Sequence, residues 1–415
     1  MRHLYTLAIL LYTAAVRLAA LLGHTKARLL ARGWKQWPQT LAALNPHTPV
    51  VWFHAASLGE FEQARPLIEA YRHLHPDHQI LLTFFSPSGY QIRKDYPLAN
   101  AVAYLPPDTP RNARRFLAAA HPSSAFFVKY EFWYNHLRAL RLRHVPTYLF
   151  SAIFRPNQYF FQPYGHWFLR QLSLSFTHLF VQNTQSLQLL HRHHIQHCSL
   201  AGDTRFDRVH QIASSALPDP VVEHFLSGHH GHVLVAGSTW PPDEQILARA
   251  RNAKPRWFPS KTIIAPHLVD RQHILQIQTL FPDSVTYSQL SAHTANHDHN
   301  VLIVDNIGLL SKLYRYASIA YIGGGFGNGI HNILEALAFG KPVLFGPNYH
   351  KFQEAIDAIS LGAAFPVRNH LDLLHGPLQQ LLTHPDALSN AAHAALLYMT
   401  QNLGSTQKIL STLEK

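Results

Sequence analysis

The sequence predicts an α/β protein built on two doubly wound, mostly parallel β-sheets. From Pro49 onward, short apolar segments of strand length alternate with helical stretches, which is typical of parallel sheets covered by helices. A second alternating series begins at residue 232, after residues 203–231, which lack strong periodicity and contain Pro218 and Pro220. The length of 415 residues also favours two domains over one.

The apolar segments locate the expected strands. The first series predicts strands at 50–53, 80–85, 101–105, 124–129, 145–150 and 177–182. The second series predicts strands at 232–238, 261–267, 300–306, 318–325 and 342–347. Residues 284–299 are interpreted as an exposed loop. In doubly wound sheets ligands bind at the carboxyl ends of strands, so functional residues are expected in the loops that follow these segments.

Four parts of the chain follow from this pattern. Residues 1–35 are a hydrophobic and basic anchor, 36–210 a first α/β domain, and 211–385 a second α/β domain. Residues 386–415 form C-terminal helices that can pack back on the first domain. Two such domains facing one cleft form the architecture called GT-B among glycosyltransferases, but duplicated α/β domains also occur in periplasmic binding proteins and some epimerases.

The N-terminal segment favours a membrane anchor. Residues 4–22 are nearly all apolar, with Arg17 inside, basic residues follow at 26–35, and no acidic residue occurs before Glu60. A cleaved signal peptide, a full membrane span and an ordinary buried helix remain alternatives. An anchor that lies in the membrane or just crosses it, with its basic flank on the cytoplasmic side, fits best.

Charge is concentrated in the first half of the chain. Residues 1–208 contain 22 Lys and Arg against 9 Asp and Glu, a net charge of +13, and the remainder has 13 against 14, a net charge of −1. This half is expected to favour an anionic membrane surface or a phosphorylated lipid, and not nucleic acid, because no nucleic-acid-binding motif or dense basic run is present. Cys198 is the single cysteine, which excludes an internal disulfide. The 32 histidines are scattered without zinc spacing, so no metal site is predicted.

A glycine-rich stretch is the strongest candidate for a nucleotide site. An apolar strand leads into it, and a helix is expected from about residue 330 to 339. Glycines let the backbone approach a phosphate, and a helix N-terminus offers free N–H groups. The candidate glycines are Gly323, Gly324, Gly325 and Gly329. The alternative is a βα turn without a ligand.

Polar residues at the start of that expected helix strengthen the prediction. His331 and Glu335 are four residues apart, so on a helix they would share one face, with Asn332 beside them. That face could present a cation or hydrogen-bond donor to the phosphate and a carboxylate to ribose hydroxyls.

Two further loops supply candidate donor contacts. Ser238 and Thr239 follow a strand and precede Pro241, a residue favoured at the first helical position, so their hydroxyl and N–H groups could bind the phosphate or simply cap a helix. His267 follows the next strand and could contact the nucleotide or be structural. No Asp-x-Asp triplet occurs in the chain, which argues against divalent-metal chelation and fits a donor with one phosphate.

Several motifs resemble one family in order and content. They are HAASLGEFEQARPLIEAYR, KYEFWYNHL, AGDTRFDRV, GSTWPPDE and GGGFGNGIHNILEALAFGKPVLFGPNYHKFQEA, and they run from about Trp52 to Glu354. They resemble the 3-deoxy-D-manno-octulosonic acid (Kdo) transferases, GT-B glycosyltransferases of family 30 in lipopolysaccharide core biosynthesis. The resemblance implies transfer of Kdo from CMP-Kdo to the lipid A precursor at the cytoplasmic face of the inner membrane, without a cofactor.

The resemblance also assigns roles. It makes residues 36–210 the acceptor-binding domain and 211–385 the nucleotide-sugar-binding domain. Glu60 matches the family's catalytic base, although a glutamate at a helix start can also simply complement the helix dipole. Glu131 matches a second family glutamate, and its alternative is a salt bridge with Lys129 or an arginine. At His267-Leu268 the sequence departs from the family pattern, which leaves the polar role of the second position open.

The sequence therefore predicts a membrane-associated, metal-independent Kdo transferase. One alternative is another GT-B enzyme that uses a UDP- or GDP-sugar. Another is a non-catalytic, membrane-docked nucleotide-binding protein, which would bind CMP without turnover and tolerate replacement of Glu60.

Overall fold

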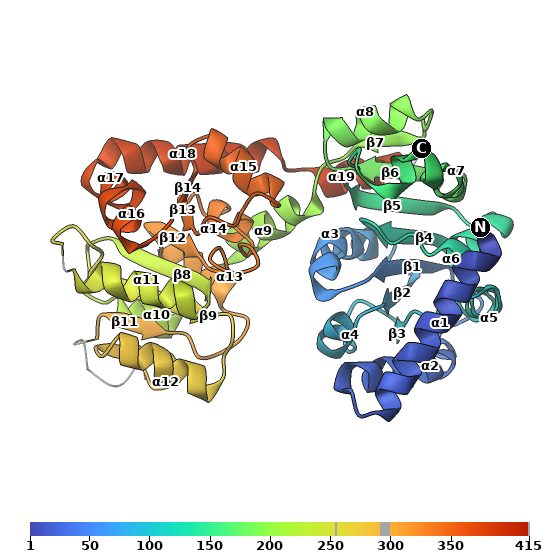
Figure 1. Cartoon of the computed structure of the whole chain (residues 1–415), viewed down its shortest axis with the longest axis horizontal. Coiled ribbons are helices and arrows are strands. Elements are labelled where there is room, and N and C mark those ends of the chain that lie inside the picture. Colours follow the sequence, from blue (N-terminus) through green and yellow to red (C-terminus); the bar gives the residue numbers. More distant parts are fainter. Residues whose placement is uncertain (254, 291–298, 414–415) are drawn as a thin grey trace. The chain divides into compact units, whose positions relative to one another are not determined.

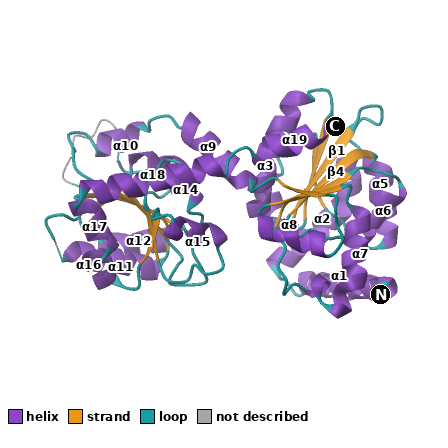
Figure 2. Cartoon of the chain, turned by 90° about the horizontal axis from the view of Figure 1, so that it is seen from above, coloured by secondary structure: helices purple, strands orange, loops and turns teal. Residues whose placement is uncertain are grey.

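Two seven-stranded, all-parallel sheets form the centres of two units of the chain (Figure 1). The structure is a computed structural model and describes residues 1–253, 255–290 and 299–413. Unit 1 comprises residues 1–208 and 403–415, and unit 2 comprises residues 209–402. Helices lie on both sides of each sheet (Figure 2). The two doubly wound sheets predicted from the sequence are thus confirmed.

The sheet of unit 1 reverses its strand order between β1 and β4. Its strands are β1 (Val50–Ala55), β2 (Gln79–Phe84), β3 (Ala101–Tyr104), β4 (Pro122–Val128), β5 (Thr147–Ala152), β6 (His178–Val181) and β7 (Cys198–Leu200). They lie in the order β3-β2-β1-β4-β5-β6-β7. The carboxyl ends of β1 and β4 therefore diverge toward helices on opposite faces, which is where doubly wound sheets bind ligands.

Both faces of this sheet are covered by apolar helices. The helices of unit 1 are α1 (Arg2–Leu21), α2 (Thr25–Leu41), α3 (Leu58–Leu74), α4 (Pro87–Arg93), α5 (Pro110–Ala120), α6 (Tyr134–Leu142), α7 (His166–Ser175), α8 (Thr184–Arg192), the C-terminal α19 (Ser405–Leu413), and the 3₁₀ turns η1 (Tyr159–Phe161) and η2 (Pro163–Gly165). One core contains residues of α2, α5, α6, α7 and α8, and the other contains residues of α3 and α19. Burial of these two layers is the main stabilising contribution to the unit.

Unit 2 has the same organisation, with its switch point between β8 and β12. Its strands are β8 (Val233–Thr239), β9 (Lys261–Pro266), β10 (Ser284–Thr286), β11 (Val301–Ile303), β12 (Ile319–Ile322), β13 (Val343–Phe345) and β14 (Ala364–Pro366). They lie in the order β10-β11-β9-β8-β12-β13-β14. The glycine-rich stretch follows β12 directly, so it lies at this switch point.

Helices also surround the second sheet. They are α10 (Pro220–Phe225), α11 (Pro241–Asn252), α12 (Arg271–Leu280), α13 (Leu310–Leu313), α14 (Leu334–Leu337), α15 (Gln353–Ser360), α16 (His370–His375), α17 (Pro377–Thr383), α18 (Pro385–Gln401) and the 3₁₀ turn η3 (Tyr314–Tyr316). The division between the units falls inside α9 (Thr204–Ser215).

Some sequence predictions are corrected by the structure. Residues 203–231, which lack strong periodicity in the sequence, contain α9 and α10 as well as the division between the units. The expected loop at 284–299 begins with the strand β10, and its residues 291–298 lie outside the described residues. The expected helix at 330–339 is reduced to the single turn α14.

The N-terminal helices are part of unit 1. Helix α1 packs along α2, and α2 buries Leu30 and Trp34 in a cluster with Tyr104 of β3. At Gly33 a Cβ would lie 1.9 Å from the Tyr104 ring, so only glycine permits this contact. Among the described residues, α1 is the one helix long and apolar enough to cross a membrane, with a mean hydropathy of 1.8.

Candidate functional site

Glu60 lies just beyond the end of β1, in the first turn of α3. Ser57 caps this helix, and its hydroxyl accepts from the Glu60 N–H at 3.5 Å. The Glu60 carboxylate turns back and accepts from the Ala56 N–H at 2.6 Å between its Oε2 atom and the nitrogen. This arrangement resembles a capping box and fixes the carboxyl at the switch point of the sheet.

The pKa of the Glu60 carboxyl is raised to near physiological pH. Burial raises the pKa of Glu60, and the negative charge of Glu131 raises it further, to about 7. The Ala56 N–H and the charge of Lys129 partly offset these effects on the pKa. A carboxyl with a pKa near the working pH can accept a proton from a reacting group and release it again.

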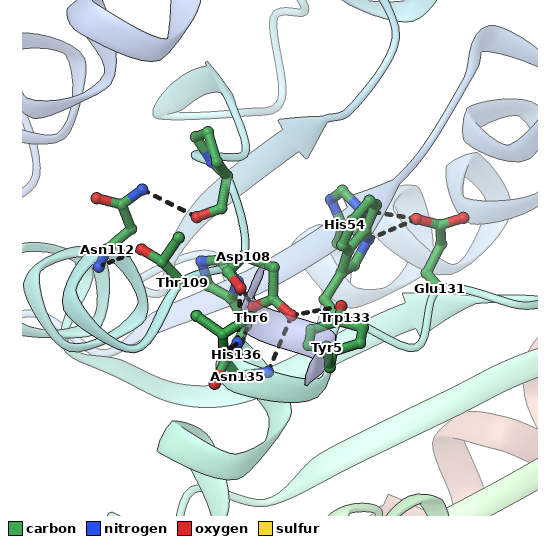
Figure 3. Close-up of polar contacts among 11 residues, drawn as sticks. Tyr5, Thr6, His54, Asp108, Thr109, Asn112, Glu131, Trp133, Asn135 and His136 are labelled. Carbon is green, nitrogen blue, oxygen red and sulfur yellow. Dashed lines mark hydrogen bonds and ion pairs between the residues drawn. The ribbon is translucent and has the colours of Figure 1, made fainter. Parts of the chain in front are cut away.

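Glu131 follows β4 and is held by a buried polar network that the sequence did not reveal (Figure 3). Its Oε2 atom lies 2.7 Å from Nε1 of Trp133 and 3.1 Å from Nε2 of His54. On its other side, Nδ1 of His54 lies 2.8 Å from Oγ1 of Thr83, and that hydroxyl accepts from Nε1 of Trp52 at 2.7 Å.

The Trp133 indole links His54 to Glu131. Its Nε1–H faces both Oε2 of Glu131, at 2.7 Å, and Nε2 of His54, at 3.0 Å. His54 and Trp133 therefore both contact the same oxygen of Glu131. The network keeps the Glu131 carboxylate in place beside the switch point.

Unusual backbone conformations mark the same strand ends. Lys129, after β4, has φ 55°, Ser151 in β5 has φ 52°, and Ser238 in β8 has φ 53°. Non-glycine residues rarely adopt positive φ, and such residues concentrate at functional sites. In both units these positions lie at carboxyl ends of strands, where ligands are expected.

The glycine turn of unit 2 is required by close backbone contacts. Gly323 donates its N–H to Gly237 O at 2.9 Å, and a Cβ on Gly323 would lie 2.2 Å from Ser238 O. A Cβ on Gly325 would lie 2.5 Å from Gly346 N, and Gly324 has φ +91°. Any larger residue at these positions would separate β8, β12 and the loop after β13.

The predicted helix N-terminus at this turn is wrong. His331 and Asn332 precede α14, which has only four residues, so His331 and Glu335 do not share a helix face. The His331 N–H instead donates to Gly323 O at 3.1 Å. The site therefore presents individual N–H groups of the turn, without the dipole of a long helix.

A buried carboxylate, Asp243, organises the turn, and sequence reasoning did not single it out. Asp243 is 1% exposed and accepts from the N–H groups of Trp240 and Gly324, both at 2.9 Å, and from the Tyr321 hydroxyl at 2.8 Å. Burial raises the pKa of Asp243 above its ordinary value, and the hydrogen bonds from the three donors offset only part of this rise. The carboxylate thus ties the start of α11 to the glycine turn.

Three aromatic rings stack beside this turn. The His267 ring stacks on both the Trp240 ring and the His331 ring, with centroid distances of 4.7 and 4.4 Å. Nε1 of Trp240 donates to Nε2 of His331 at 2.9 Å, so a neutral His331 carries its proton on Nδ1. Burial and the charge of His267 lower the pKa of His331 to about 4, so His331 is a neutral donor at physiological pH.

A cavity of about 300 Å³ lies against these groups. Of the sequence-predicted residues, Gly324, Gly329 and His331 line it. Its lining is completed by Trp240, Pro242, Asp243, Phe326, Gly327 and Asn328. Its size lies at the lower end of the range for small-molecule sites, about 300–1,000 Å³.

Other predicted residues serve the scaffold around this cavity. The buried hydroxyl of Thr239 donates to Glu244 at 2.9 Å, and Glu244 also contacts Nε2 of His273 at 2.9 Å. Nδ2 of Asn332 donates to Glu335 at 3.1 Å. These contacts direct the Thr239 hydroxyl and the Asn332 amide toward protein partners.

Among residues 1–253, 255–290 and 299–413, no group of three or more His, Cys, Asp or Glu is arranged to hold a metal ion.

Comparisons with known proteins agree with the motifs. The family model described as 3-deoxy-D-manno-octulosonic-acid transferase (kdotransferase) matches residues 32–208. The 3-deoxy-D-manno-octulosonic acid transferase of Bordetella pertussis is 28% identical over 436 residues, covering 97% of this chain and 98% of that protein. The protein of the same name from Aquifex aeolicus is 25% identical over 328 residues, covering 78% of this chain and 84% of that protein.

Solved structures support the fold. A UDP-GlcNAc 2-epimerase from Neisseria meningitidis bound to UDP-GlcNAc has a TM-score of 0.63, with 16% identity, over 88% of this chain and 99% of that one. This likeness shows the fold alone. The family model, the near-full-length relatives and the ordered motifs thus agree in showing that this chain is similar to the 3-deoxy-D-manno-octulosonic acid transferases, which are glycosyltransferases.

Proposed function

We propose that this chain is an inverting glycosyltransferase that moves Kdo from CMP-Kdo to the lipid A precursor, lipid IVA, in lipopolysaccharide biosynthesis. Relatives that carry the transferase name over nearly the whole chain support this assignment. The single structural observation that carries the chemistry is Glu60, a carboxyl with a pKa of about 7 at the switch point of unit 1.

Glu60 is the general base in this proposal. A hydroxyl oxygen of the acceptor attacks the anomeric carbon of Kdo while the bond from that carbon to the CMP phosphate oxygen breaks. The hydroxyl proton passes to the ionised Glu60 carboxylate, and CMP leaves with the electron pair of the broken bond. Attack from the side opposite the leaving group inverts the anomeric centre. Glu131 orients the acceptor or the sugar donor from its position against His54 and Trp133.

Unit 2 is the proposed site for CMP-Kdo. The neutral Nδ1–H of His331 and N–H groups of the glycine turn would face the phosphate, and the leaving charge would be stabilised by these donors. Ser238, Thr239 and His267 would support the nucleotide from the ends of β8 and β9, with Thr239 acting through Glu244. Glu335 would act on the ribose through its contact with Asn332.

Unit 1 is proposed to bind the lipid acceptor, and the protein is proposed to lie at the cytoplasmic face of the inner membrane. The apolar helix α1 and the net charge of +13 in residues 1–208, from 22 basic and 9 acidic residues, both suit an anionic lipid surface. Lipid IVA, the proposed acceptor, carries acyl chains that match the apolar helix and phosphate groups that match the positive charge.

The assay is direct. Purified full-length protein is incubated with CMP-Kdo and lipid IVA, and the lipid products are analysed by mass spectrometry. A mass increase of one or more Kdo units supports the proposal, and the absence of product with CMP-Kdo but transfer from a UDP- or GDP-sugar would reject it. CMP binding without any turnover would favour a non-catalytic protein.

A further inference from the structure

A second and larger cavity lies in unit 1, beside Glu131. Its volume is about 660 Å³, and it lies between α1, residues 130–133 and residues 158–168. Its lining is mainly apolar or aromatic and includes Leu4, Ala8, Phe132, Phe160, Trp167 and Phe168. Glu131 is the one charged side chain among its lining residues. Such a lining suits a ligand segment that makes no hydrogen bonds.

The α1 wall of this cavity is held in place by a buried polar contact (Figure 3). The Tyr5 hydroxyl donates to Oδ2 of Asp108 at 2.7 Å, and Asp108 is 1% exposed. The same carboxylate accepts from the N–H groups of Asn135 and His136, at 2.9 and 2.8 Å, in the first turn of α6. The Tyr5 ring also packs edge-on against Tyr134 at 5.6 Å. Helix α1 is thus attached to the segment that carries Glu131.

The outer face of α1 is an unusual apolar surface. Leu4, Leu7, Leu11 and Leu18 are 63, 52, 63 and 58% exposed. Their spacing of three, four and seven residues places them on one stripe of the helix. A helix fixed to the protein along its length and apolar on its outer stripe fits one that lies in the membrane interface. Leu4 belongs both to this stripe and to the cavity lining, so the cavity adjoins the surface that would meet lipid.

We propose that this cavity binds one fatty acyl chain of the lipid acceptor, with α1 as its membrane-side wall and Glu131 at the sugar end. The inference rests on the proposed function, because that function makes the acceptor an acylated sugar. Three observations favour an acyl chain: the lining has one charged side chain, that side chain is the candidate catalytic Glu131, and the cavity adjoins the leucine stripe of α1. Through this site the enzyme would select acylated over deacylated acceptors.

The first test fills the cavity from its α1 wall. Ala8→Trp places an indole in the cavity from an exposed position, and Ala15→Trp makes the same change two turns along the helix, also at an exposed position, outside the lining. We expect Ala8→Trp to raise the KM for lipid IVA at least about tenfold, equivalent to about 1.4 kcal/mol. The KM for the fully deacylated disaccharide and the affinity for CMP are expected to stay unchanged, and Ala15→Trp to behave as wild type with both acceptors.

An equal effect of Ala8→Trp on both acceptors, or none on either, would overturn the acyl site. Absence of Kdo transfer by the wild-type enzyme would instead reject the proposed function.

A second measurement tests the acyl site without relying on turnover or on the folding of the Ala8→Trp variant. Lipid IVA with a diazirine in one acyl chain is photolysed with the wild-type protein, and the adducts are mapped by mass spectrometry. We expect adducts in residues 1–8 or 158–168. Adducts confined to other segments, or equal labelling by a diazirine phospholipid that lipid IVA does not displace, would contradict the site.

Discussion

One proton on Glu60 affects both catalysis and folding. Gln can still accept the Ala56 N–H but cannot take the acceptor proton, so we expect Glu60→Gln to lower kcat by about 10²–10⁴-fold. The pKa of Glu60 rises from an ordinary 4.5 to about 7 on folding, so its contribution to the free energy of unfolding is fully present below about pH 4.5 and is lost as pH rises through about 7. The variant is therefore expected to melt higher than wild type at pH 8 and about equally at pH 4.

Kinetics and thermal melting of the same preparations check both expectations. Turnover within a few-fold of wild type would remove Glu60 as the base and make Glu131 the leading candidate. A lower melting temperature of Glu60→Gln than of wild type at pH 8 would show that the surroundings do not destabilise the ionised Glu60 carboxylate.

The charge of Glu131 is expected to set the working pH of Glu60. Because that charge raises the pKa of Glu60, Glu131→Gln should move the acidic limb of the kcat/KM profile to lower pH. Glu62→Gln, on the same helix as Glu60 but paired with Arg93, is the matched control and is expected to leave the limb in place. An acidic limb with the same midpoint in Glu131→Gln and wild type would contradict the assigned electrostatic coupling.

At the scale of elements, the glycine turn and its aromatic stack form one small binding unit. His331 lines the cavity, whereas Glu335 contacts Asn332 and is outside the lining. We therefore expect His331→Ala to weaken CMP binding by about 1.5–3 kcal/mol, the range for a hydrogen bond to a charged group, and Glu335→Ala to weaken it less. Titration calorimetry measures both. Wild-type CMP affinity in His331→Ala would exclude the cavity as the phosphate site.

Strands inside clear apolar runs could be predicted from the sequence, including β11 and β13, which have only three residues each. Strands β7, β10 and β14 are equally short and were not predicted, because three residues are too few for a periodic signal. The apolar run at 330–339 predicted a helix, but the His331 N–H is bonded to Gly323, so tertiary contacts override helix propensity there.

The candidate site could be predicted only where its residues lie in one continuous motif. Glu60 and the glycines belong to continuous motifs in the loops after strands. The contacts of His54 with Glu131 and of Asp243 with Gly324 join residues 77 and 81 positions apart, and only the fold brings these partners together. Their signal in the sequence was limited to polar residues within otherwise apolar or motif segments.

For the molecule as a whole, the chemistry proposed here uses protein donors and no metal. The chain has no Asp-x-Asp triplet, and the part that the structure describes holds no group of metal-ligating side chains. We expect Kdo transfer to persist in EDTA, with kcat within about twofold of the untreated enzyme, because neutral N–H donors stabilise the single leaving phosphate. Full loss of activity in EDTA that magnesium restores would require a metal in the mechanism.

Membrane attachment of the whole protein is expected to depend on α1 alone among the N-terminal helices. Helix α2 buries Leu30 and Trp34, so a truncation at residue 35 removes core side chains, whereas one at residue 23 removes α1 only. We expect the protein without residues 1–23 to leave the membrane fraction and to bind CMP with wild-type affinity, because the glycine turn belongs to unit 2.

The protein lacking residues 1–23 and the protein lacking residues 1–35 are expected to differ in melting temperature. Loss of α1 leaves Asp108 with its backbone donors but without the Tyr5 hydroxyl, which costs about 1–3 kcal/mol. Loss of residues 1–35 additionally opens the Trp34 cluster, and burying a large aromatic side chain is worth about 3–5 kcal/mol. The shorter truncation is therefore expected to melt well above the longer one. Complete sedimentation of the protein lacking residues 1–23 with membranes at high salt would show that another surface of the chain holds it there.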